Sequence, residues 1–72
     1  MSEYTRIREQ QTYSRALRVM RYRLRSAPAQ RLWAARRLGT YDGVTDTPRR
    51  ALEGWTSEEI DAWLEAWRAS RA

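Results

Sequence analysis

The 72-residue chain contains no cysteine, no histidine, no lysine and no phenylalanine. The absence of cysteine excludes disulfide bonds and thiolate metal sites, and the absence of histidine removes most of the remaining zinc chemistry. We therefore expect no metal and no cofactor. All fourteen basic residues are arginine, and there are ten alanines. This bias is typical of a GC-rich genome, so part of the arginine excess reflects codon usage.

Long apolar segments are also absent. The longest apolar run is far shorter than the roughly 18 residues needed to cross a bilayer, and the N-terminus has no apolar region of the signal-peptide kind. We therefore expect a cytoplasmic protein. An arginine- and tryptophan-rich helix lying on an anionic membrane is the weakest of the binding classes, because the apolar face of the first helix is needed for the core.

The length indicates one domain over residues 1–72, with no repeat, low-complexity tract or interdomain linker. A chain of this size buries only about 60% of the surface that its unfolded form exposes, so its stability is marginal. Binding to a partner, or association into a homo-oligomer, would stabilise it further.

Positive charge is concentrated in the first half of the sequence. Residues 1–37 contain ten arginines and two acidic residues, a net charge of +8, whereas residues 38–72 contain four arginines and seven acidic residues, a net charge of −3. Together these give the +5 of the whole chain. Codon usage does not explain this asymmetry. Such a domain either forms ion pairs between its basic and acidic halves or presents one of these halves to a partner.

The stretch from Thr5 to Arg25 predicts a long first helix, because it lacks glycine and proline and its apolar residues recur with a helical period. The expected core side consists of Tyr13, Ala16, Leu17, Met20 and Leu24. The other side carries Arg8, Arg15, Arg18, Arg21, Tyr22 and Arg25, with Arg23 nearer the apolar edge. This arginine stripe is either a solvated charged face or a surface that binds a polyanion.

Pro28 predicts the start of a second helix, since the residue before a proline avoids the helical region and proline itself suits the first helical turn. We expect the helix to end at Leu38, with Gly39 in the left-handed conformation after it. Its inner face consists of Leu32, Ala35 and Leu38.

Trp33 lies on the flank of this second helix. Arg36 and Arg37 follow it by three and four residues, close enough for a guanidinium group to cover the indole. The indole is either packed against a neighbouring helix, as tryptophans usually are, or exposed as a contact residue. The sequence leaves both interpretations open.

Residues 40–45 predict a minimal hairpin or a tight loop, because Asp42-Gly43 is flanked by residues that favour strands. Asp42 and Asp46 lack the ligand series of a calcium loop, so no metal site is expected here.

A short helix is expected to follow, over Arg49 to Glu53. Thr47 and Pro48 have the residue types of its cap and first position, and Gly54 that of its end. Leu52 is its expected inward residue.

The clearest helix signal lies between Thr56 and Trp67. Thr56 and Glu59 form a capping box, in which the Thr56 hydroxyl accepts from the Glu59 amide and the Glu59 carboxylate reaches back to the Thr56 amide. Trp55 and Ile60 occupy the positions of a hydrophobic staple. The apolar face contains Ile60, Trp63, Leu64 and Trp67, and the opposite face contains Glu58, Asp61 and Glu65.

These elements predict an all-α domain of three main helices plus one short helical turn. We expect the last helix to pack across the Leu17, Met20 and Leu24 face of the first helix and the Leu32 and Leu38 face of the second.

Catalysis is not expected, since the chain has no histidine, cysteine or glycine-rich phosphate loop, and its carboxylates lie mostly on a solvated helix face. An acid–base group of Tyr41, Asp42 and Asp46 can be imagined, but nothing in the pattern orients it.

The expected function is therefore binding. The first possibility is nucleic acid, held by its phosphate backbone, because the pI is high and arginines are concentrated on the first two helices with aromatic residues among them. The alternative is a small adaptor or inhibitor, of the mobile-element type, that docks on an acidic protein through arginine and tryptophan hot spots. The candidate contact residues are Arg8, Arg15, Arg18, Arg21, Tyr22, Arg25, Trp33, Arg36 and Arg37, with Tyr4 and Arg31 beside them.

Overall fold

The computed structural model describes residues 3–45 and 51–72, with side chains from residue 11 onward. Its elements are α1 (Glu3–Arg21), the short 3-10 helix η1 (Arg23–Arg25), α2 (Pro28–Thr45) and α3 (Ser57–Arg71). The described residues contain no strand, so the predicted all-α fold with three main helices is confirmed. None of the helices in this described part is long and apolar enough to span a membrane.

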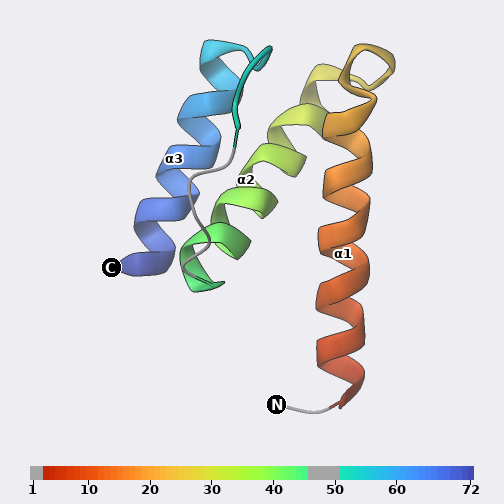
Figure 1. Ribbon diagram of the computed structural model, residues 1–72, viewed down its shortest axis with the longest axis vertical. Helices are drawn as coiled ribbons and strands as arrows, with labels where there is room; N and C mark the ends of the chain where they lie inside the picture. The colour runs from red at the N-terminus through yellow and green to blue at the C-terminus, as the bar shows by residue number, and fades with distance from the viewer. Residues whose placement is uncertain (1–2, 46–50) are drawn as a thin grey trace.

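The three helices lie in a row, and α2 in the middle packs against both α1 and α3 (Figure 1). The corner at η1 turns the chain back, so α1 and α2 run in opposite directions, whereas α2 and α3 run in the same direction. The outer surfaces of α1 and α3 therefore form two opposite edges of a molecule that measures 35 × 26 × 19 Å. The expected packing of the last helix on the second is confirmed, whereas its expected packing on the first is minor, since α3 contacts mainly α2.

Two glycines allow α2 and α3 to pack closely. A Cβ atom on Gly39 would collide with the Trp63 carbonyl oxygen, and one on Gly43 would lie 2.7 Å from Ser70 Cβ and 2.8 Å from the Trp67 carbonyl oxygen. Each glycine disfavours a helix by about 1 kcal/mol relative to alanine, but packing against a neighbouring helix outweighs that preference.

The predicted end of the second helix at Leu38 is therefore wrong, and so is the hairpin or loop at residues 40–45. The helix α2 continues through Gly39 and Gly43 to Thr45. The local signal of Asp42-Gly43 is overridden because both residues are buried, each on the side of the helix that faces the rest of the protein.

The core consists mainly of small side chains. Its buried members are Ala16, Met20, Ala34, Ala35, Leu38, Ala62 and Trp63, against which Tyr13, Val19, Leu32, Leu52, Trp55, Leu64 and Trp67 pack. The predicted inner face of the second helix is thus confirmed.

The predicted core side of the first helix is confirmed for Ala16 and Met20 but not for its two leucines. Leu17 lies at the surface and Leu24 is 89% exposed, whereas Val19 packs against the core. The predicted helix to Arg25 is too long, because α1 ends at Arg21 and η1 has three rather than 3.6 residues per turn. The change of winding directs Leu24 outward.

The predicted start of α3 and its exposed acidic face are confirmed, and the predicted apolar face is confirmed for Trp63, Leu64 and Trp67 but not for Ile60, which is absent from the core cluster. Thr56 is its N-cap and accepts a hydrogen bond of 3.2 Å from the Glu59 amide. Trp63 is buried, and its ring stacks on that of Trp67 with 6.2 Å between centroids. The acidic face is exposed at Glu58, Asp61 and Glu65.

The segment that precedes α3 covers part of the core with Leu52 and Trp55. The Trp55 amide donates to the Leu52 carbonyl at 3.1 Å, and Gly54 has a φ of 86°, a conformation that glycine adopts readily. The predicted cap at Thr47 and Pro48 and the start of the short helix at Arg49 lie outside the described residues. Residues 51–53, where that helix was expected to end, are not helical.

Candidate functional site

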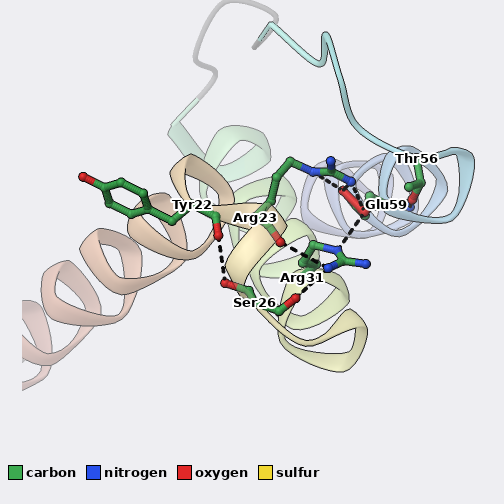
Figure 2. Close-up of polar contacts among 6 residues, drawn as sticks. All are labelled: Tyr22, Arg23, Ser26, Arg31, Thr56 and Glu59. Carbon is green, nitrogen blue, oxygen red and sulfur yellow. Dashed lines mark hydrogen bonds and ion pairs between the residues drawn. The ribbon is translucent and has the colours of Figure 1, made fainter.

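The corner between α1 and α2 is attached to α3 by a buried carboxylate. Glu59 is only 2% exposed. Arg23 donates to Glu59 Oε1 from its Nε at 3.0 Å and from its Nη2 at 2.7 Å, and the same Nη2 lies 2.7 Å from Glu59 Oε2 (Figure 2). A fork of this kind is the strong form of an ion pair, and it joins residues 36 positions apart in the sequence.

Arg31 completes the corner from the first turn of α2. Its Nη1 donates to the Ser26 carbonyl at 2.6 Å and to the Arg23 carbonyl at 3.1 Å, and its Nε lies 3.4 Å from Glu59 Oε2 (Figure 2). We name this set, Arg23, Arg31 and Glu59, the corner network. It removes Arg31 from the candidate contact residues, because its side chain is used inside the fold.

The pKa of the Glu59 carboxyl reflects two opposed effects. Burial raises the pKa, but the hydrogen bonds from Arg23 and Thr56, together with the charge of Arg23, outweigh burial and leave the pKa below its ordinary value of 4.5. The Arg23 guanidinium has a raised pKa because of its hydrogen bonds to Glu59, which desolvation only partly offsets. Glu59 and Arg23 are therefore both charged at neutral pH.

Four other arginines of α1 and η1, among those whose side chains are described, lie at the surface. Arg15, Arg18, Arg21 and Arg25 are exposed, and none of them forms an ion pair with a carboxylate in the described part of the chain. We name these four residues the basic edge. Arg8 belongs to the predicted stripe, but its side chain lies outside the described part. On α2, Arg36 is exposed and Arg37 is half-buried.

Three aromatic side chains lie beside the basic edge. Tyr22 points away from the corner network, and the Arg21 guanidinium is 5.8 Å from its ring centroid (Figure 2).

Trp33 is 38% exposed, and the group over its ring is Arg15 of α1, at 5.8 Å, not Arg36 or Arg37 as the helical spacing predicted. Trp33 thus lies at the surface of the seam between α1 and α2. The third ring is that of Tyr41, which stacks on Tyr13 with 3.8 Å between centroids.

The imagined acid–base group is not assembled. Tyr41 lies against α1, whereas Asp42 is buried and accepts a hydrogen bond of 2.9 Å from Trp63 Nε1 of α3. Asp46 lies outside the described residues, and the residues that are described contain no group of acidic side chains arranged to hold a metal ion.

Sequence reasoning did not assign the structural roles of Glu59 and Asp42. The sequence identified Glu59 only as part of the cap of α3. Glu59 does belong to the cap, where Thr56 Oγ1 donates to Glu59 Oε2 at 2.9 Å, but it is also the ion-pair partner of Arg23. One signal was available, because Glu59 follows the inward-facing period of Ala62 and Trp63 on α3.

Comparisons of this chain with protein-family models, with curated proteins and with solved structures find no match.

Proposed function

We propose that this protein binds nucleic acid through its phosphate backbone, with the basic edge as the main contact surface. One observation carries this proposal: four exposed arginines of α1 and η1 lack any described acidic partner, while the exposed acidic residues Glu58, Asp61 and Glu65 are on α3, and α2 lies between α1 and α3 (Figure 1). Backbone phosphates are the partners that such an array of guanidinium groups suits best.

The distance between the two edges supports this assignment. Exposed charges that are further apart than about 8 Å interact little at physiological salt, because counterions screen them. Away from the corner, one helix diameter of about 10 Å separates α1 from α3, so Glu58, Asp61 and Glu65 neutralise little of the potential at Arg15 and Arg18. A polyanion that follows α1 is attracted without meeting strong local repulsion.

The test is a salt titration of binding to a generic duplex and to a single strand. Arg18→Ala and Arg21→Ala should each weaken binding to a similar degree for all sequences, and each should reduce the magnitude of the salt slope by about one unit. Arg68→Ala, an exposed arginine on α3, is the matched control and should change neither quantity. Absence of binding at low salt by the folded protein would contradict the proposal.

A second function has specific support at the corner. Leu24 is 89% exposed and, with Met20 and Gly54, lines an open hollow of about 360 Å³ that Arg21 and Arg25 border. An apolar side chain beside two cations suits an acidic protein, as expected for an adaptor or inhibitor. In that case Leu24→Ala should reduce capture of a partner from lysate that survives nuclease treatment, and the losses among arginine variants should be uneven.

A further inference from the structure

We propose that the seam between α1 and α2 stacks unpaired bases, so that the nucleic acid bound by this protein is single-stranded. This inference rests on the proposed function, because it assigns a substrate class to the surface that adjoins the basic edge. The residues that carry it are Trp33, Arg37 and Tyr41 of α2 and Arg15 of α1, which we name the stacking seam.

The three α2 residues of the stacking seam lie four positions apart and therefore follow one line along the helix. Two of them are aromatic and stay accessible, since Trp33 is 38% exposed and Tyr41 is 39% exposed. Arg37 comes between the two aromatic residues along this line, where it can reach a phosphate of the strand that connects the two stacked bases. Aromatic and basic side chains thus alternate along the line.

Residues from α1 hold both rings in place. The Arg15 guanidinium covers Trp33 at 5.8 Å from the ring centroid, and Tyr13 stacks on Tyr41 at 3.8 Å with an interplanar angle of 19°. Each ring therefore loses little further conformational freedom when a base binds, which favours affinity. Arg15 also belongs to the basic edge, so a strand bound there continues directly onto the stacking seam.

The spacing of the rings favours single strands over duplexes. Eight residues of helix place Trp33 and Tyr41 about 12 Å apart along the axis. The bases of a duplex are stacked on one another about 3.4 Å apart, so neighbouring bases already cover their faces. Unpaired bases, in contrast, can separate and stack on aromatic rings or guanidinium planes.

The test measures fluorescence anisotropy at low salt with three labelled probes: a deoxyribose pyrimidine strand, a ribose pyrimidine strand and a duplex with the same number of phosphates. The wild-type protein should bind at least one of the single strands more tightly than the duplex. Trp33→Leu and Tyr41→Leu should each weaken binding of that strand by about 5-fold or more and leave duplex binding unchanged. The sugar of the tighter strand then identifies DNA or RNA as the ligand.

The matched control is Trp67→Leu. Trp67 also lies under a guanidinium, with Arg71 4.9 Å from its ring centroid, but it is on α3, where it packs against the core and not in the seam between α1 and α2. This variant should not change the preference for single strands. The wild-type preference is measured first, so the test stands even if a leucine variant proves unstable in a thermal melt.

The outcomes separate the two proposals. Equal binding of duplex and single strands, or single-strand binding that folded Trp33→Leu and Tyr41→Leu proteins retain in full, would overturn the stacking seam. If Arg18→Ala still weakens binding in that case, the phosphate-binding function stands alone. Failure of the folded wild type to bind any of the three probes would overturn both.

Discussion

The two seams of α2 differ in how closely the helix backbones approach. Toward α3, Gly39 and Gly43 bring the backbone against the carbonyl oxygens of Trp63 and Trp67, and Asp42 accepts the Trp63 indole hydrogen. Toward α1, the seam contains large rings that stay partly exposed. Close packing at Gly39 and Gly43 allows α2 and α3 only one relative position. Toward α1, in contrast, the rings of Trp33 and Tyr41 remain accessible to a ligand. The close contacts that stabilise the fold are thus on one side of α2, and the binding proposed above would use the other side.

Removal of the buried Trp63 indole between α2 and α3 should destabilise the protein most. Trp63→Ala should destabilise the protein by about 3 to 5 kcal/mol, because it removes a buried ring and leaves the Asp42 carboxylate without this donor. Trp33→Ala, at the exposed seam, should cost about 1 to 2 kcal/mol. Thermal melts of both variants check the comparison, and an equal loss for the two would show that the seams do not differ.

A substitution at Glu59 tests how strongly the corner network attaches the corner between α1 and α2 to α3. Glu59→Gln should cost about 2 to 3 kcal/mol, since the two arginines lose a buried ion-pair partner but Gln keeps part of the hydrogen bonding. Chemical denaturation at pH 7 measures this change.

The same residue predicts a dependence on pH. Because the pKa of Glu59 is lower in the folded protein than its ordinary value of 4.5, its stabilising contribution is present above pH 4.5 and is lost as the pH falls through the folded pKa. Glu59→Gln should remove this part of the acid sensitivity. A variant that loses stability with acid as steeply as the wild type would contradict the assignment.

A substitution at Gly39 tests the close packing of α2 on α3 and should reduce stability by a smaller amount. Gly39→Ala should destabilise by about 1 to 3 kcal/mol despite the higher helix propensity of alanine, because the new methyl group pushes α2 away from α3. Thr40→Ala, at the exposed next position, should be neutral or slightly stabilising. If Gly39→Ala raises the melting temperature, the close contact with Trp63 does not exist in solution.

The smallest effect concerns the cap of α3. Thr56→Ala should cost about 1 kcal/mol, since the Glu59 amide loses its acceptor, while Ser57→Ala at the first helical position should be nearly neutral. Urea denaturation resolves this difference. A larger loss at Ser57 would place the helix start one residue later.

Much of the fold could be predicted because its signals are local. The start of α2 at Pro28, the cap at Thr56 and the exposed acidic face of α3 follow from residues within a few positions of one another. The errors arose where contacts between residues far apart in the sequence override local conformational preference. The pair Asp42-Gly43 favours a turn by itself, but burial of both residues keeps it helical. The candidate site was predicted as a stripe of arginines, and Arg15, Arg18, Arg21 and Arg25 are exposed, as both a solvated face and a binding surface require.

Periodicity, caps and composition act within one or two helical turns, so the helical class, the starts of α2 and α3 and the charge asymmetry follow from local sequence alone. Contacts between helices determine whether a glycine ends a helix or allows close packing, and which arginines form contacts within the fold. Arg23 and Arg31 are chemically identical to Arg18, yet they meet Glu59 because the corner at η1 places them against the first turn of α3. That meeting depends on three-dimensional distance, which no local pattern encodes.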